Sequence, residues 1–110
     1  MKLSDIPTGL TDWSSLSASS QIGANGAAAV RGRQLGDVQI RLVAYSAHYE
    51  ADHWCHKGHI LFVVSGSVAI EHSDGRRYEI STGMSYHVAD DDGAPHRLIS
   101  NSGASVFIVD

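Results

Sequence analysis

Short apolar runs separated by turn signals follow one another from residue 38 to residue 109, and this pattern constrains the fold most. In residues 38–45 apolar side chains alternate with their neighbours, which is the period of a half-buried strand. Asp74-Gly75 suits the positive φ angles of a type I′ hairpin turn. No segment keeps a helical period for more than two turns. The pattern predicts an all-β domain, a sandwich or small barrel of about nine strands.

The expected strands are short, and Gly-, Asn- or Asp-containing turns separate most of them. They span residues 27–35, 38–45, 59–64, 67–72, 76–80, 84–89, 96–100 and 104–109, with Ser65-Gly66 as one of the turns.

The 110 residues are enough for one domain with one core. Residues 1–26 lack a regular pattern and read as an extended arm with at most one short strand, whereas residues 27–110 form the barrel. Trp13, Leu16 and Ile22 are the isolated apolar anchors of the arm. We expect the arm to cover a strand edge by packing on the barrel or on a dimer partner.

Composition narrows the possible partners. Eight basic residues against twelve acidic ones, a net charge of −4, argue against nucleic acid as a partner. The opening MKLSDIPTGL has no apolar run of a signal peptide, and no segment has the length of a membrane span. The single cysteine excludes an internal disulfide framework, and a free thiol without an export signal predicts a cytoplasmic protein.

All seven histidines lie within residues 48–96, and some have the spacing of metal ligands. If residues 53–59 form a regular strand, His53, Cys55 and His59 share one face, because alternate side chains point the same way. His96 follows Pro95, whose fixed φ places it at a strand entrance and orients the next residue. These four donors, three from one segment and His96 from another, predict a site for one divalent transition metal.

The role of Cys55 decides the chemistry of that site. Three histidines and a thiolate would complete a tetrahedral ion such as zinc, which would make the site structural or regulatory. If Cys55 stays off the metal, the three histidines leave positions open for a small-molecule substrate on zinc, iron, nickel or copper. Tyr86 and His87 lead toward the site, and by alternation only one of them faces the pocket. The remaining histidines, His48, His56 and His72, are interpreted as ordinary surface or hydrogen-bonded residues.

The sequence resembles the cupins. The first cupin motif, G-x5-H-x-H-x3-4-E-x6-G, corresponds to Ala47-x5-His53-x-Cys55-x3-His59-x6-Gly66, so cysteine replaces the second histidine and histidine replaces the glutamate. The second motif corresponds to the segment from Gly83 to His96, with two extra residues before Gly93, and Asn101 comes one place late. The strings ADHWCHKGH, GMSYHVAD, PHR and FIVD, with the opening MKLSDIP and TDWSS, resemble the small bacterial DHCW-motif cupins.

The resemblance implies a double-stranded β-helix, or jelly-roll barrel, with a metal in its mouth. It carries metal ligation onto His53 and His96, places His59 at the glutamate position and places Cys55 at the second histidine position. It also implies a homodimer. Two function classes follow: a metal-dependent enzyme of oxygenase, isomerase or lyase type, or a non-catalytic metal- or small-ligand-binding protein with a sensor or storage role.

Overall fold

The computed structural model describes residues 3–110, which form nine β-strands and one 3-10 turn. The elements are η1 (Trp13–Ser15), β1 (Ser19–Ile22), β2 (Ala27–Leu35), β3 (Val38–Tyr45), β4 (Tyr49–Glu50), β5 (His59–His72), β6 (Arg77–Ser81), β7 (Ser85–Val88), β8 (His96–Ser100) and β9 (Ala104–Val109). This turn is the only helical segment in that range, so no helix there is long and apolar enough to cross a membrane.

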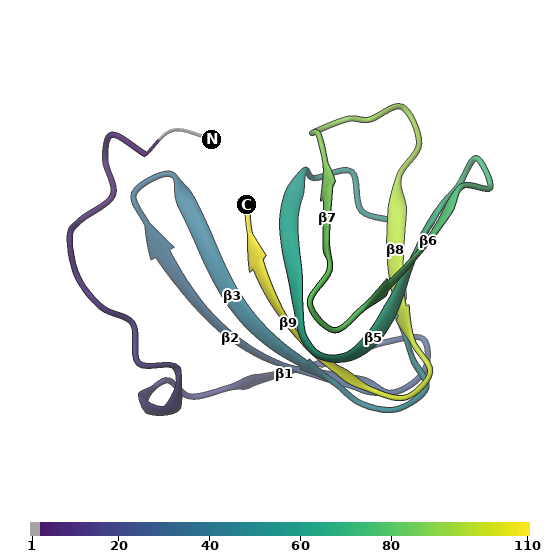
Figure 1. Cartoon of the computed structure of the whole chain (residues 1–110), viewed down its shortest axis with the longest axis horizontal. Coiled ribbons are helices and arrows are strands. Elements are labelled where there is room, and N and C mark those ends of the chain that lie inside the picture. The colour runs from purple at the N-terminus through teal and green to yellow at the C-terminus, as the bar shows by residue number, and fades with distance from the viewer. Residues whose placement is uncertain (1–2) are drawn as a thin grey trace.

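The strands pair antiparallel and curl into an open barrel of two facing sheets, as Figure 1 shows. One sheet contains β1, β2, β3, β9, the first half of β5 and β7, and the other contains β4, β8, the second half of β5 and β6. β5 therefore belongs to both sheets, and its bend connects them. The all-β barrel predicted from the apolar spacing is confirmed.

The predicted turn at Ser65-Gly66 is wrong, because β5 runs through it as one strand of 14 residues. The register against β9 shifts between Val63 and Ser65, which is a β-bulge, and Gly66 has φ +78°. A bulge and a positive-φ glycine let a strand bend sharply without leaving the ladder. The turn signal in the sequence therefore marks the corner at which β5 passes from one sheet to the other.

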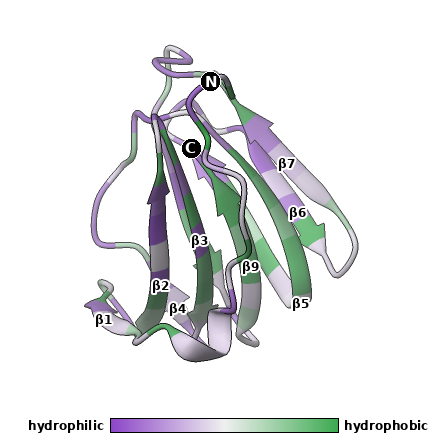
Figure 2. Ribbon diagram, turned by 90° about the vertical axis from the view of Figure 1, so that its left-hand side faces the viewer, coloured by the Kyte–Doolittle hydropathy of each residue, from purple (hydrophilic) through white to green (hydrophobic). Residues whose placement is uncertain are grey.

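The core lies between the two sheets. Its most buried side chains come from alternate positions of β3, β5 and β9, as expected for strands with one face inward. They include Val43, Val63, Ile70 and Val106, each 1% exposed or less. On the opposite face of β5, Ile60, Phe62 and Val64 are exposed. Figure 2 shows that much of the β5 ribbon is coloured as hydrophobic.

The N-terminal arm packs against the barrel of its own chain. Trp13 in η1 meets Phe107 of β9 edge to face, with ring centroids 6.1 Å apart. The Arg31 side chain donates to the Leu16 carbonyl at 3.0 Å, and Arg33 donates to the Leu10 carbonyl at 2.9 Å. The arm also includes β1, which extends the sheet beyond β2.

Candidate metal centre

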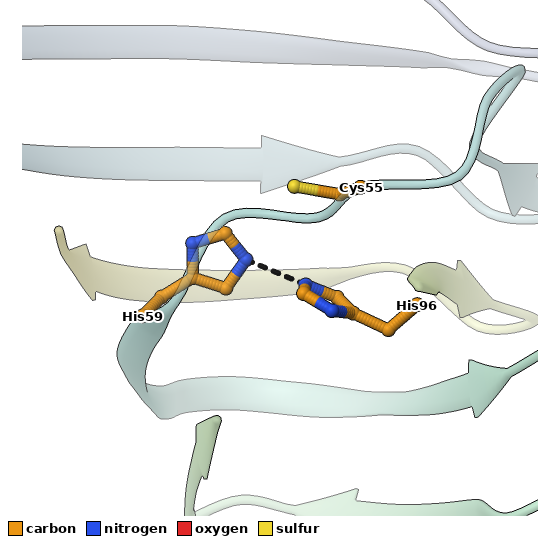
Figure 3. Close-up of side chains that lie close together, drawn as sticks. All are labelled: Cys55, His59 and His96. Carbon is orange, nitrogen blue, oxygen red and sulfur yellow. Dashed lines mark hydrogen bonds between the residues drawn. The ribbon is translucent and has the colours of Figure 1, made fainter. Parts of the chain in front are cut away.

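Three predicted ligands, Cys55, His59 and His96, meet inside the barrel. Their donor atoms all lie within 4.8 Å of one another. Cys55 comes from the connection before β5, whereas His59 and His96 are the first residues of β5 and β8. Figure 3 shows the two imidazole rings facing each other with the Cys55 thiol beside them.

The backbone around Cys55 and His96 positions both side chains. The two residues form an isolated antiparallel bridge, in which each amide donates to the other's carbonyl at 2.7 and 2.9 Å. Pro95 directly precedes β8, so the expected strand entrance at His96 is confirmed. The connection from Cys55 to β5 passes close to the end of β7, because a Cβ at Gly58 would lie 2.8 Å from the Val88 carbonyl oxygen. The backbone of this connection is thus held against two strands.

A hydrogen bond joins the His59 and His96 rings in this arrangement. Their Nε2 atoms are 2.7 Å apart, so one ring must donate and the other accept. His59 Nδ1 lies 3.1 Å from the Asp110 carboxylate, which assigns the His59 proton to Nδ1 and leaves its Nε2 as the acceptor. A carboxylate behind a ligating histidine is the usual outer partner in metal sites, because it orients the ring and raises its basicity.

Burial keeps both rings in the metal-binding form. The pKa of His96 is lowered to about 4, mainly by desolvation and also by the nearby rings of His59 and His72. Desolvation also lowers the pKa of His59, although the Asp110 carboxylate opposes this effect. Both imidazoles are therefore neutral near neutral pH, and a neutral imidazole is the form that ligates a metal.

We expect the metal-free protein to lose stability as the pH falls from about 6.5 to 4. The unfolded chain protonates its histidines near pH 6.5, whereas folded His96 stays neutral down to about pH 4. The unfolded state binds more protons in this window, so the free energy of unfolding falls by up to about 1.4 kcal/mol per pH unit for each such histidine. Urea unfolding of chelator-treated protein across this range measures the slope. A slope equal to that of His96→Gln would contradict the assignment.

The donor set fits a transition metal. One thiolate and two neutral imidazoles are soft or borderline donors, and three protein ligands leave a fourth position open on a tetrahedral ion. A cavity of about 130 Å³ adjoins the three residues, and its wall includes Tyr45, Tyr49 and Arg41.

The structure does not bring His53, the fourth predicted ligand, into this group. Its side chain is 67% exposed and its Nδ1 lies 2.6 Å from the Asp52 carboxylate. The condition for a shared face, a regular strand over residues 53–59, is not met, because only Cys55 of residues 51–58 forms a bridge. Alternation therefore does not apply there, and His53 instead lines the mouth of the same cavity.

Of the two predicted pocket residues, Tyr86 is buried and His87 is exposed. The Tyr86 hydroxyl lies 2.7 Å from His72 Nε2, and His72 Nδ1 lies 2.9 Å from the Ala94 carbonyl. His72 Nδ1 therefore carries the proton, and Tyr86 donates to Nε2. His72 was interpreted as an ordinary histidine from sequence, and its burial follows from pairing with His96 across β5 and β8. A long-range pairing of this kind leaves no local signal.

Comparisons with known proteins bear on the fold. No protein-family model and no curated protein matches the sequence. An RmlC-like cupin from Shewanella frigidimarina has a TM-score of 0.71 at 14% identity, over 96% of this chain and 91% of its own. Ectoine synthase from P. lautus has a TM-score of 0.72 at 16% identity, over 93% of this chain and 76% of its own. Fe(II)-HppE with an alternative substrate has a TM-score of 0.75 at 13% identity, over 94% of this chain and 60% of its own.

These likenesses are structural, and the narrower DHCW-motif resemblance stays a prediction. The alignment with the Shewanella frigidimarina cupin extends over most of the curled antiparallel barrel, since it covers 96% of this chain. The chain therefore has the cupin fold, and its structural neighbours are cupin-superfamily proteins.

Proposed function

We propose that this protein is a metal-dependent enzyme that acts on a small organic molecule, with one divalent transition metal held by Cys55, His59 and His96. One observation carries the proposal: three donor atoms of suitable chemistry lie within 4.8 Å of one another beside an interior cavity. The cupin-fold neighbours support it, since they include a sugar phosphate isomerase, ectoine synthase and Fe(II)-HppE.

The protein's own residues prepare the site for a metal. Asp110 holds His59 through Nδ1, and Arg41 in turn holds Asp110 at 2.9 Å. The Lys57 amide donates to Cys55 Sγ at 3.4 Å, which helps to orient the thiol. A bound ion would act as a Lewis acid or activate water at its open position. The cavity next to it has the volume of a few water molecules or a small organic group.

Metal analysis of the purified protein tests the proposal directly. We expect about one transition metal per chain, and a higher melting temperature on adding zinc, nickel or iron(II) under anaerobic conditions. A protein that holds no metal and does not respond to any of these ions would contradict the proposal.

The alternative is a non-catalytic metal- or ligand-binding cupin. Testing it takes two steps: whether Cys55 is a ligand, and then whether the metal keeps an open position. We expect a thiol reagent to label Cys55 quickly in chelator-treated protein and slowly after metal is restored, because a ligating thiolate is no longer a free nucleophile. Cobalt(II) substitution gives an independent measure, since a Cys55 ligand produces a thiolate-to-metal charge-transfer band.

Azide added to the cobalt protein then reports the open position. A spectral change means that an outside molecule can reach the metal, which supports an enzyme. An unchanged spectrum supports the closed, non-catalytic site. Equal labelling of Cys55 with and without metal would show that Cys55 is not a ligand.

The homodimer implied by the family resemblance also stays a prediction. The exposed Ile60, Phe62 and Val64 on the outer face of β5 are the apolar residues that would favour association. Light scattering of the purified protein, with Phe62→Glu as the comparison, measures the oligomeric state.

A further inference from the structure

A second and larger hollow lies next to the metal centre. It has a volume of about 600 Å³ and is lined by the β2–β3 turn, the start of β5, the end of β7 and the end of β9. His59 lines both this groove and the interior cavity, so its ring is a shared wall. The apolar part of the lining consists of Ile60, Val88 and Val109.

The charges of the groove are unbalanced. Its lining contains three carboxylates, from Asp37, Asp90 and Asp110, and one ammonium, from Lys57. Lys57 lies 3.8 Å from Asp110 and offsets that charge, so Asp37 and Asp90 remain without a cation from the lining. The Gly58 amide donates to Asp90 Oδ1 at 2.6 Å and holds this carboxylate in place. The groove therefore carries negative charge beside an apolar wall.

Asp110 supplies an independent sign of a missing ligand. Its side chain is only 2% exposed, and its Oδ2 binds Arg41 and His59. Its Oδ1 is buried and has no hydrogen-bond partner. A buried carboxylate oxygen without a donor is destabilising, so such atoms are rare unless something binds them.

The position of Lys57 indicates that Asp110 Oδ1 can accept a hydrogen bond from an ammonium group. Its ammonium lies 3.8 Å from Asp110 Oδ1, beyond hydrogen-bond distance, and its side chain is 59% exposed. An exposed lysine held only by a long ion pair is easily displaced, because exposed ion pairs contribute little to stability. A ligand ammonium can thus replace that of Lys57 and donate directly to Oδ1.

We propose that this groove binds the ammonium group of a small organic amine, with Asp110, Asp37 and Asp90 as the negative partners and the apolar wall against its carbon chain. As a substrate class this rests on the proposed function, since His59 connects the groove to the metal centre. As a binding site it depends on the groove alone and can be tested without metal.

Three isosteric probes test the charge preference: butylammonium, butyrate and butanol. Titration of the chelator-treated, isotopically labelled protein is followed at the backbone amides of Gly58, Asp90 and Val109 by NMR. We expect saturable shifts with butylammonium, weaker shifts with butanol and the weakest with butyrate, and a loss of butylammonium affinity as salt is added. Tighter binding of butyrate would overturn the proposal and assign the groove to an anion bound at Lys57. No saturable shift with any probe would also overturn it.

Charge-changing variants locate the site. Asp37→Asn and Asp90→Asn should each lower butylammonium affinity about two- to fivefold, and Lys57→Met should raise it by a similar factor. Asp90→Asn keeps an oxygen that accepts from the Gly58 amide, so the local fold is preserved. Asp91→Asn is the matched control, since it makes the same charge change in the same loop outside the groove lining.

Two further outcomes are informative. Weaker butylammonium binding in Lys57→Met, or an equal effect of Asp91→Asn, would contradict the proposal. Metal content is measured on an untreated portion of each purified protein. Amine binding without metal binding would reject the proposed function and leave the groove, whereas metal binding without amine binding would reject the groove alone.

Discussion

We expect His96→Ala to lose metal far more severely than His56→Ala. His96 is buried, its Nε2 lies 2.7 Å from that of His59, and its backbone is bridged to Cys55. Its removal takes away one of three converging donors, so metal affinity should fall by more than the 10- to 100-fold typical of losing an outer-shell partner. His56 is exposed and lies outside the group, which makes it the matched control.

Metal titration with a chromophoric chelator as competitor measures the affinities. Asp110→Asn should lower metal affinity about 10- to 100-fold, which is less than His96→Ala and more than His56→Ala. It changes only the partner of His59 Nδ1. His53→Ala should resemble the control, since its exposed ring pairs with Asp52. Equal losses in His96→Ala and His56→Ala would show that the ligand set is wrong. His96→Gln and a melting curve of each metal-free variant separate loss of a ligand from loss of the fold.

The second large effect is expected for Gly66→Ala. Gly66 has φ +78° at the corner of β5, and a Cβ there would clash with the Gly103 carbonyl and lie 2.8 Å from the Ala104 Cα. Both contacts are with the backbone of β9 and its preceding turn, so relief requires moving a paired strand. We expect a loss of about 3 kcal/mol or more in the free energy of unfolding, out of the 5–15 kcal/mol typical of a domain.

Gly75→Ala provides the control. Gly75 has φ +96° in the β5–β6 turn, and a Cβ there meets nothing within 4 Å. Gly75→Ala should therefore lower the free energy of unfolding by about 1–2 kcal/mol, from the backbone strain of alanine at positive φ alone. Urea unfolding of both variants gives the difference that belongs to the clash. Equal losses would mean that the backbone of β9 yields, and that the corner is not tightly packed.

Much of the barrel was predictable from local patterns. The strands over residues 27–35 and 38–45 match β2 and β3, and the expected strands near the end of the chain match β8 and β9. These segments alternate or contain β-branched residues, and clear turns bound them, so local preference and tertiary packing agree. The turn predicted at Ser65-Gly66 is wrong because the same residue types form turns and bulges. Only pairing with β9 distinguishes the two.

The candidate site was partly predictable. Cys55, His59 and His96 were identified from spacing, from the residue after Pro95 and from the family resemblance, and the structure brings their donors together. His53 was grouped with them by strand alternation, which fails because residues 51–58 are irregular. Asp110 and the His72–Tyr86 pair were missed, because each lies far in sequence from the residues it contacts.

The sequence by itself determined the all-β class, the positions of most strands and the residue types available to hold a metal. These follow from side-chain periodicity and turn chemistry, which act over a few residues. Only the tertiary structure decided which histidines converge, which face of β7 is buried and which carboxylate stands behind His59. Those outcomes depend on strand register across the barrel, where a shift of one residue would move every side chain to the opposite face.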